Sequence, residues 1–511
     1  MRKALGIFLV AVACCAAFLS WTSFPDPDAF YHANAALLLW RHGSIHAFPW
    51  LDLTTLGTGY MDQHFLFHVI EAPFVALFGL HLGARILALF LAAACVTTCY
   101  LLLRWMKVRH AEVWALLLLA TSPLMVRLLL AKASPLAIIL FVLGLAATWK
   151  RKPFLVAFIA FLFALTHGGW VYLIGSIVLM GIGDVLYRFV MEERKSIIDL
   201  LSKPYLLSFG AACVGVTIGL LVHPNFPQDF SLLWVQVVKI GLQTPFNHVI
   251  LGSEWLPVTP SWMLAGLALW FIMLGVGIAG VFMAPRKPIE LNAAKAVVVF
   301  AFPVAALLAM TFKSRRSVEY LVPALVLWVP WLWNMIDLQR FRFVVMESLP
   351  KQLREWIPWI LIAAIGALIF KNLQSTYVIL HDGRYPDAIY AEAFSAVSSR
   401  AHEGDRVFHS DWDEFPILWS LDDRLKYVAG LDPTFLYEAS STLSDEYRDV
   451  TWGQTTTTPE QVWNFVHDRI NARFVFIDKR DHQKLFDAIT DDSRYELLRD
   501  TNDAATFEVR P

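Results

Sequence analysis

Charged residues are scarce in this 511-residue chain, and the scarcity is uneven. Only 17% of the residues are charged, against about 25% in ordinary globular proteins, and 57% are hydrophobic. Lys and Arg number 42 and Asp and Glu 43, so the formal net charge of −1 excludes the broad basic field that nucleic-acid binding requires. The shortage falls on residues 1–373, whereas residues 374–511 have the composition of a soluble domain.

Cysteine and glycosylation acceptor sequences are also rare or absent. No Asn-x-Ser/Thr sequence occurs, and no internal repeat or low-complexity segment is apparent. All the cysteines lie in apolar runs and are expected to be small buried hydrophobes, so residues 374–511 fold without disulfides. Both absences favour a bacterial inner membrane over the endoplasmic reticulum. The five cysteines are Cys14, Cys15, Cys95, Cys99 and Cys213.

Long apolar runs fill the first part of the chain, and many approach the roughly 20 residues that cross a bilayer. They predict a polytopic α-helical membrane protein with about 11 transmembrane helices in residues 1–373. Alternating helix-like and strand-like segments predict a small soluble α/β domain in residues 374–511, with strands at 406–410, 426–430, 473–478 and 505–510. The predicted spans are 4–22, 83–103, 111–130, 134–149, 153–167, 169–187, 205–222, 261–284, 296–312, 320–337 and 356–373.

Basic residues fix the predicted orientation, because cytoplasmic loops are enriched in Lys and Arg. With a cytoplasmic N-terminus, and the first run read as a signal-anchor rather than a cleaved signal peptide, an odd number of spans places the C-terminal domain on the periplasmic or extracellular side. The apolar stretch 64–80 is then an interfacial helix within a first external loop, 23–82, and a second long external loop covers 223–260. The basic cytoplasmic segments are 104–110, 150–152, 188–203, 285–295 and 339–355.

The segment FPDPDAFYHANAALLLWRHG (24–43) places two carboxylates, Asp26 and Asp28, directly after the first span. Tyr31 and His32 follow on a predicted helix. Either acid could simply cap that helix, since Asp is favoured at a helix start and Pro27 suits the first turn. At a membrane surface, however, an acid is also what an enzyme needs to orient or deprotonate an acceptor.

This segment resembles the first external loop of GT-C superfamily glycosyltransferases, especially the catalytic subunit of oligosaccharyltransferases. These enzymes use polyprenyl- or dolichyl-linked sugar donors. Their loop reads Asp-Pro-x-x-Tyr-His or similar, and its acid binds a divalent metal and the acceptor. Alignment on the Tyr-His pair puts Asp28 at that acid and leaves Asp26 and His32 as supporting residues.

The resemblance continues in order along the chain. LTHGGWVYLIG (165–175) is similar to a Trp-Gly-Gly-Tyr stretch, with His167 in place of the Trp, and LGSEWLP (251–257) puts Glu254 at a loop glutamate. KSRRSVEYLVP (313–323) looks like the Arg-rich start of a late span, where an Arg grips the donor phosphate. GDRVFHSDWDEFPILWSLDDRLKYVAGLDP (404–433) looks like the region that opens with the acceptor-binding Trp-Trp-Asp motif, here Asp411-Trp412-Asp413. NARFVFIDKRD (471–481) looks like a late strand of that domain.

Two departures from the family pattern bear on chemistry. The family's second acidic pair is missing from SPLMVRLLLAKASP (122–135), where Arg127 matches but Lys132 and Ser134 replace the acids. A divalent-cation site of Asp28 and Glu254 alone would bind Mg²⁺ or Mn²⁺ poorly, so we expect Lys132 to supply the positive charge instead. The acceptor motif lacks its first Trp, so recognition of a peptide sequon is not implied.

The sequence thus predicts an oligosaccharyltransferase-like enzyme of the cell envelope that transfers a sugar or glycan from a polyprenyl-(pyro)phosphate-linked donor. The acceptor, a protein, lipid or glycan, stays open. The rivals are a transporter or flippase of lipid-linked sugars and a non-catalytic assembly protein on a GT-C scaffold. The resemblance implies Asp28 and Glu254 as catalytic residues, Arg315, Arg316 and Lys132 as donor-phosphate ligands, and Trp412 and Asp413 as acceptor ligands.

Other features have ordinary explanations beside functional ones. The Arg pair could contact anionic lipid headgroups, and Glu254 could be a solvated loop carboxylate. His64 and His68, four residues apart beside Asp62, have a zinc-like spacing, although interfacial histidines are commoner. The GVGIAG run (275–280) lies inside a span and favours helix packing over nucleotide binding. Glu319 and Asp184 are expected to be charges at span boundaries.

Overall fold

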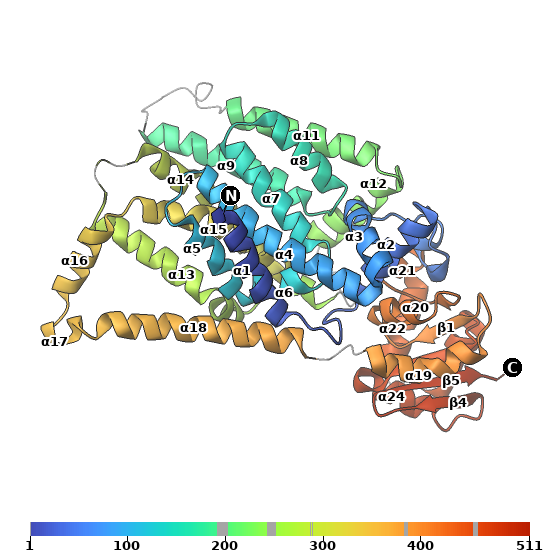
Figure 1. Cartoon of the computed structure of the whole chain (residues 1–511). Helices are drawn as coiled ribbons and strands as arrows, with labels where there is room; N and C mark the ends of the chain where they lie inside the picture. Colours follow the sequence, from blue (N-terminus) through green and yellow to red (C-terminus); the bar gives the residue numbers. More distant parts are fainter. Residues whose placement is uncertain are drawn as a thin grey trace. The chain divides into compact units, whose positions relative to one another are not determined.

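The computed structural model describes residues 2–191, 203–242, 252–286, 288, 290–382, 387–452 and 458–510. It divides into two compact units (Figure 1). We call the first the helical unit; it comprises Met1–Leu19, Ile86–Val222 and Ser253–Leu380. The second, which we call the mixed unit, comprises Ser20–Arg85, His223–Gly252 and His381–Pro511. The predicted first external loop, 23–82, therefore belongs over its whole length to the same unit as the C-terminal domain.

The helical unit is built from apolar helices joined by short connections. α8 and α11 approach closely because α11 carries glycine where they touch: a Cβ at Gly215 would lie 2.1 Å from the carbonyl oxygen of Ala157. Its helices are α1 (Arg2–Phe18), most of α4 (Leu80–Trp105), α5 (Ala111–Leu116), α6 (Ser122–Leu129), α7 (Ser134–Trp149), α8 (Pro153–Ala164), α9 (Trp170–Met191), α11 (Lys203–Leu221), α13 (Pro260–Met283), α14 (Leu291–Lys313), α15 (Val318–Asn334), α16 (Leu338–Ser348), α17 (Lys351–Arg354) and α18 (Ile357–Leu380).

Each of the eleven predicted spans coincides with a helix or a bent pair of helices, and the chain is a multi-pass membrane protein. Six described helices are long and apolar enough to cross a bilayer, or seven if α5 and α6, bent by 77°, count as one broken span. The helices α1, α7, α8 and α15 have only 12 to 17 residues, fewer than the usual crossing length. The count of about 11 spans stays a prediction.

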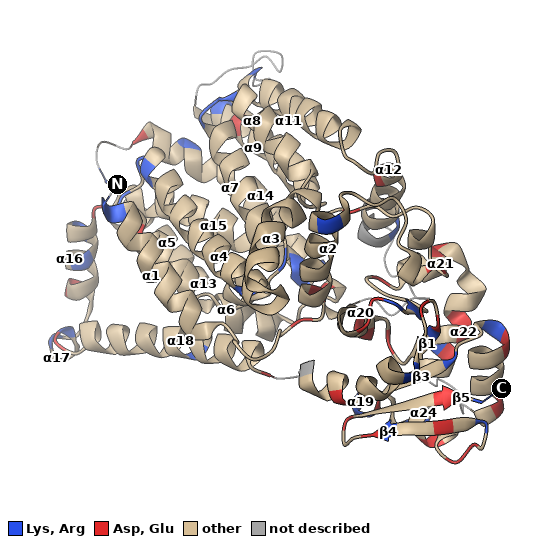
Figure 2. Cartoon of the chain, turned by 45° about the vertical axis from the view of Figure 1, so that its right-hand side comes forward, with Lys and Arg blue, Asp and Glu red and all other residues tan. Residues whose placement is uncertain are grey.

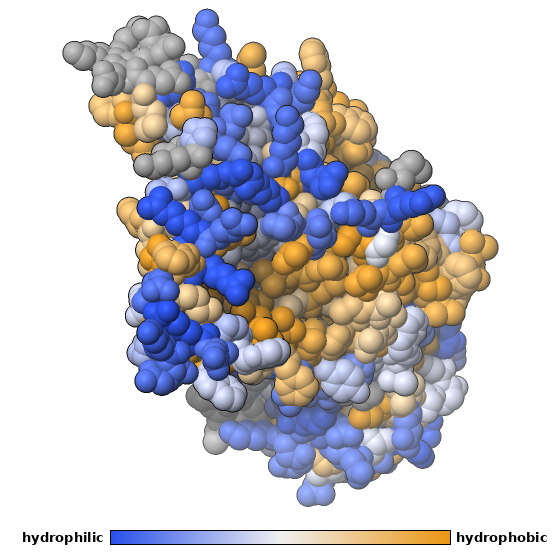
Figure 3. Space-filling view, turned by 60° about the vertical axis from the view of Figure 1, so that its left-hand side comes forward, coloured by the Kyte–Doolittle hydropathy of each residue, from blue (hydrophilic) through white to orange (hydrophobic). Residues whose placement is uncertain are grey.

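The surface of the helical unit is that of a protein immersed in lipid. Its long helices are free of charge along most of their length, with Lys, Arg, Asp and Glu gathered near helix ends (Figure 2). Apolar side chains form a broad field on the face drawn in Figure 3, bordered by hydrophilic ones. In α18 only 6% of the apolar 18-residue stretch is buried, so this helix is exposed along nearly its whole length.

The C-terminal part of the mixed unit is an α/β domain around one five-stranded sheet of order β2-β1-β3-β5-β4. β1 pairs in parallel with β2 and β3, whereas β5 runs antiparallel to β3 and β4. The strands are β1 (Arg406–His409), β2 (Lys426–Tyr427), β3 (Phe474–Asp478), β4 (Tyr495–Asp500) and β5 (Ala504–Val509). The helices are α19 (Asp387–Arg400), α20 (Phe415–Leu421), α21 (Thr434–Ala439), α22 (Ser441–Trp452), α23 (Pro459–Trp463) and α24 (Lys479–Ile489).

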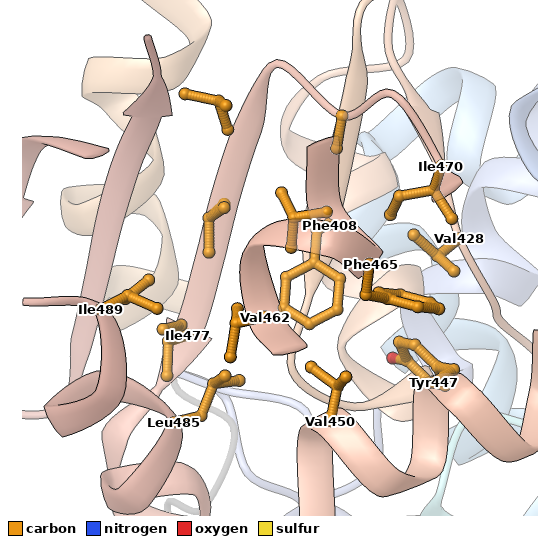
Figure 4. Packing of buried hydrophobic residues seen from close by; sticks show 14 of the residues in the cluster. Phe408, Val428, Tyr447, Val450, Val462, Phe465, Ile470, Ile477, Leu485 and Ile489 are labelled. Atoms are coloured by element: carbon orange, nitrogen blue, oxygen red, sulfur yellow. The ribbon is translucent and has the colours of Figure 1, made fainter. Parts of the chain in front are cut away.

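Hydrophobic contacts between the sheet and its helices hold this domain together. Phe408 of β1 and Ile477 of β3 point toward Tyr447 of α22 and Leu485 of α24 (Figure 4). All five residues of β3 are buried, as expected of a central strand covered on both faces. The sequence predicted four of the five strands. It missed β4, an edge strand with mostly exposed polar residues and no apolar alternation.

The remaining segments of the mixed unit are short helices and loops that pack on this domain. α2 (Asp28–His42) lies against α3 (Phe65–Phe78) and α20. α3 has 14 residues, too few to cross a bilayer as a straight helix. Asp52 accepts from Arg406 at 2.9 Å and from Lys426 at 2.8 Å, which fastens the loop after α2 to β1 and β2. α12 (Gln228–Leu233) and the π-helical η4 (Trp234–Leu242) complete the unit.

Candidate active site

Arg127 is the centre of an ionic cluster in the helical unit. It projects from α6, which restarts at Ser122-Pro123 after the bend, where Pro suits the first turn. Its guanidinium donates to Glu254 at 2.6 Å and to Glu319 at 2.9 Å. The Arg127 side chain is 11% exposed and that of Glu319 is fully buried. Hydrogen-bonded ion pairs of this kind are what make buried charge tolerable.

Arg316 is the second arginine of the cluster. It lies in the 3-10 turn η6 (Arg315–Ser317), between α14 and α15. Its guanidinium donates to Glu254 at 3.1 Å, lies 4.0 Å from Glu319 and 2.9 Å from Nε2 of His167. The guanidinium also lies over the indole of Trp255, 5.3 Å from its centroid. These contacts fix the plane of the guanidinium, which is how Arg is oriented for two-point contact with phosphate oxygens.

His167 and Lys132 join this cluster. His167 precedes α9, and the hydroxyl of Tyr320 lies 3.2 Å from its Nδ1. Lys132 follows α6 and is 8% exposed. Burial would raise the pKa of the Glu254 carboxyl, but the charges of Arg316, Arg127 and Lys132 outweigh burial and hold that pKa well below its usual range. Glu254 is therefore ionised at neutral pH, and it is a partner for cations rather than an acid that donates a proton.

The cluster carries an excess of positive charge. Arg127, Lys132 and Arg316 contribute +3, and Glu254 and Glu319 contribute −2, so the sum is +1. Such a group of fixed cations can bind an anion with little reorganisation. The structure thus brings together His167, Glu254, Arg316 and Lys132 of the predicted residues.

One prediction about this region changes, and the role of Arg315 stays a prediction. Glu319 is not an ordinary boundary charge, because it is fully buried against Arg127; its spacing of three residues from Arg316 was the available signal. Arg315 does not join the Glu254 contacts. Its backbone N–H donates to the carbonyl of Leu256 at 3.0 Å, and its Nε has no hydrogen-bond partner among the described residues.

Asp26 and Asp28 separate into two roles at the start of α2 in the mixed unit. The Asp26 carboxylate accepts the backbone N–H of Asp28 at 3.0 Å, so Asp26 supports the turn that leads into the helix, whose N-cap is Pro27. Asp28 is the first residue of the helix and is partly exposed. A carboxylate at this position is favoured by the helix dipole. Since Asp26 is engaged in the turn, Asp28 is the candidate acid.

A chain of hydrogen-bonding side chains links His32 of α2 to His68 of α3 and to Asp62. Nδ1 of His32 lies 2.8 Å from Nε2 of His68, and Nδ1 of His68 lies 2.8 Å from the Asp62 carboxylate. Both nitrogens of His68 are occupied, so it cannot also ligate zinc with His64. No group of three ligating side chains suited to a metal occurs within the described ranges. Sequence reasoning noted Asp62, His64 and His68 but not their link to His32.

The Asp-Trp-Asp motif follows β1 in the mixed unit. Asp411 caps the short turn η7 (Trp412–Glu414) by accepting the N–H of Trp412 at 2.7 Å. The Trp412 indole is partly buried and packs against the hydrophobic cluster of Figure 4. Asp413 is also partly exposed. Neither residue shares a unit with the cluster around Glu254, so their role as acceptor ligands stays a prediction.

Solved structures identify the fold. The chain aligns with the oligosaccharyltransferase AglB of Archaeoglobus fulgidus, in complex with an inhibitory peptide and a dolichol-phosphate, at a TM-score of 0.61 and 13% identity over 93% of this chain and 69% of AglB. AglB has also been solved with Zn and sulfate. ArnT from Cupriavidus metallidurans, bound to undecaprenyl phosphate, aligns at 0.59 and 14% identity over 99% and 98% of the two chains.

A mycobacterial arabinofuranosyltransferase, AftD, aligns at a TM-score of 0.53 and 11% identity over 100% of this chain and 40% of AftD. No protein-family model matches the sequence, and no curated protein matches it. At these identities the likeness shows the fold alone, which is the fold of the GT-C superfamily glycosyltransferases. The GT-C-like fold expected from the sequence is thereby confirmed, whereas the roles of the motif residues stay predictions.

Proposed function

We propose that this protein transfers a sugar or glycan from a polyprenyl-(pyro)phosphate-linked donor to an acceptor on the non-cytoplasmic face of a bacterial inner membrane. The observation that most supports this is the net positive cluster of Arg127, Lys132 and Arg316. Fixed cations stabilise a departing lipid phosphate. The solved neighbours include AglB with a dolichol-phosphate and ArnT with undecaprenyl phosphate, which fits a donor of this class.

On the donor side, Arg316 and Lys132 bind the phosphate oxygens. Glu254 holds Arg316 in place, and Glu319 does the same for Arg127. Arg315, in the same turn as Arg316, adds positive charge for the lipid headgroup. As the sugar–phosphate bond breaks, negative charge grows on the phosphate, and preorganised cations stabilise that charge without moving.

On the acceptor side, Asp28 orients and deprotonates the nucleophile. Asp26 fixes the first turn that carries Asp28. Trp412 and Asp413 bind the acceptor. The chemical nature of the acceptor is open, since the motif at residues 411–413 lacks the first Trp of the sequon-binding pattern.

The enzyme works without a divalent metal in this proposal. The described residues hold no three-ligand cluster, and Lys132 replaces an acid of the family pattern. AglB has been solved with Zn and sulfate; here Asp28 and Glu254 are the two carboxylates left as metal ligands, and Glu254 is already paired with two arginines.

A transporter or flippase is the second candidate. It would require ionisable residues along a path through the spans and, usually, an internal repeat. The cluster instead comes from junctions between helices, namely the end of α6, the turn before α9, and the turns η5 (Ser253–Trp255) and η6. A non-catalytic scaffold protein would keep the fold but show no turnover.

An assay of sugar transfer in lipid nanodiscs tests the proposal. Membrane extracts containing polyprenyl-linked sugars are supplied, and released polyprenyl phosphate is measured by mass spectrometry. Asp28→Asn and Arg316→Gln should each lower turnover at least about 10²-fold. Arg188→Gln is the matched control, because Arg188 forms a partly buried ion pair with Asp184 at 3.0 Å outside the cluster. Wild-type activity in Asp28→Asn, or no release by wild type, would refute it.

A further inference from the structure

The side chains behind α2 form a directed chain of proton carriers. Asp62 also accepts the backbone N–H of His64 at 3.1 Å, and His68 is completely buried. Burial would raise the pKa of Asp62, but contact with His68 and His64 outweighs burial and lowers that pKa, so the carboxylate stays ionised. An ionised Asp62 can only accept a hydrogen bond, and this fixes the direction of the whole chain.

The tautomers of both histidines follow from that direction. Nδ1 of His68 carries the proton donated to Asp62, so in neutral His68 the Nε2 atom accepts from Nδ1–H of His32. The second nitrogen of His32, Nε2, is then the basic one. A carboxylate at the far end of such a chain stabilises the imidazolium that forms when this nitrogen takes a proton.

His32 lies one helical turn after Asp28. Residues four apart on a helix share a face, with Cβ atoms about 5–6 Å apart, and α2 runs without interruption over both positions. A carboxylate is by nature a weaker base than an imidazole, so an imidazole is the better group to keep a proton near neutral pH.

We propose that His32, supported by His68 and Asp62, takes up the proton that the acceptor loses during glycosyl transfer. This rests on the proposed function. The acceptor's O–H or N–H bond breaks as its O or N forms a bond to the sugar C1. The C1–O bond to the phosphate breaks, and the phosphate leaves with the electron pair. The proton passes through the Asp28 carboxylate to Nε2 of His32, while Asp62 stays ionised.

Other titratable groups surround the chain and bear on its pH response. The ring of His64 stands 4.9 Å from that of His32. The hydroxyls of Tyr31 and Tyr60 are 2.7 Å apart, and Nε2 of His223 lies 3.1 Å from the Asp62 backbone carbonyl. Burial lowers the pKa of His223, which keeps it neutral near pH 7. Glu71 of α3 is fully buried, and no described residue hydrogen-bonds its carboxyl oxygens. None of these groups interrupts the links from Asp62 to His32.

The test is the pH dependence of sugar transfer in three variants. His32→Gln should lower kcat/KM by about 10²- to 10³-fold. Asp62→Asn removes the charge that supports the imidazolium, so the limb on which activity rises with pH should move down by about one pH unit, with a lower plateau. His223→Gln is the matched control. His223 is 3% exposed against 4% for His32, and its hydrogen bonds go to the Asp62 backbone carbonyl and the Asn225 N–H, not to His32 or His68, so the variant should keep the wild-type rise of activity with pH.

A second readout does not depend on activity. In the full-length protein with ¹⁵N-labelled histidine, the difference spectrum between wild type and His32→Gln should contain one imidazole that titrates between about pH 5 and pH 8. Absence of that titration, or an unshifted limb in Asp62→Asn, overturns the assignment of the proton to His32. If His32→Gln turns over normally while Asp28→Asn is inactive, the inference fails and the proposed function stands.

Discussion

The cluster around Arg127 and the chain that ends at His32 are both buried and polar, but they hold different kinds of group. In the helical unit, two arginines and a lysine face two carboxylates, and these charges persist over the whole physiological pH range. In the mixed unit, one carboxylate contacts the first of two hydrogen-bonded imidazoles, and imidazole is the side chain best suited to gain or lose a proton under physiological conditions. Fixed charge suits an ion that must be held, and titratable charge suits a proton that must be moved.

The largest effect is expected from breaking the fixed-charge cluster at its centre. Arg127→Gln leaves the fully buried Glu319 without its 2.9 Å partner and with only the 4.0 Å contact to Arg316, which should lower the free energy of unfolding by about 3–5 kcal/mol. Replacing both partners, in Arg127→Met with Glu319→Leu, should recover most of that loss. Thermal unfolding of the purified protein measures both.

Arg109→Gln is the control for this comparison, since its contact with Glu290 is 3.8 Å long and about half exposed, and such pairs contribute little. If Arg127→Gln unfolds at the wild-type temperature, the ionic cluster is not what stabilises this part of the helical unit.

A smaller effect is expected from a histidine that burial keeps neutral. Burial lowers the pKa of His409 in β1 to about 4, below its ordinary value near 6.5. The folded state therefore binds fewer protons than the unfolded state, and His409 contributes stability above about pH 6.5 that is lost as the pH falls toward 4. Relative to pH 7, roughly 2 kcal/mol should be lost at pH 5.

His409→Gln should remove that contribution to the slope of stability against pH, measured as the difference in melting temperature between pH 7 and pH 5. The exposed His467 is the reference, because the slope should change less in His467→Gln than in His409→Gln. Equal slopes in wild type and His409→Gln would show that His409 titrates normally, and that burial alone does not distinguish it from the chain at His32.

The next effect shows whether Glu254 positions Arg316 or acts as an acid in the reaction. Glu254→Gln raises the net charge of the cluster from +1 to +2 while freeing Arg316 to move. We expect turnover to fall about tenfold and inhibition by added polyprenyl phosphate to become stronger, since phosphate then meets more positive charge. Steady-state kinetics with and without the lipid phosphate measure both quantities. Unchanged inhibition together with unchanged turnover would remove Glu254 from the donor site.

The sequence anticipated the chemistry of these clusters better than their partners. His167, Glu254, Arg316 and Lys132 were all predicted and do meet, because the motifs fall at helix junctions on one predicted face of the membrane. Glu319 was missed because an acid near the end of a span usually meets water, and only the packing of α15 against α6 shows otherwise.

The same limit applies to the mixed unit. The spacing of His64 and His68 is compatible with a metal site. Spacing does not give the direction of a side chain, however, and in the structure the two ring nitrogens of His68 contact His32 and Asp62. The contact between His32 and His68 joins positions 36 residues apart, so no local pattern reveals it. In the C-terminal domain, the apolar alternation of β1 and β3 was readable, whereas the polar edge strand β4 was not.

The smallest effect is expected from removing metal. If Lys132 supplies the positive charge that a divalent cation would otherwise provide, EDTA should leave the rate of sugar transfer unchanged. Added Mg²⁺ or Mn²⁺ should not raise that rate. Loss of activity in EDTA with recovery in Mn²⁺ would show that Asp28 or Glu254 binds a metal, and would make the fixed cations auxiliary to it.

A structure determined with a polyprenyl phosphate bound will show whether the cations of the helical unit hold a lipid phosphate. We expect phosphate density within about 3 Å of the Arg316 guanidinium and the Lys132 ammonium, and loss of that density in Arg316→Gln. A phosphate bound elsewhere, with Arg316 still paired only to Glu254 and Glu319, would contradict it.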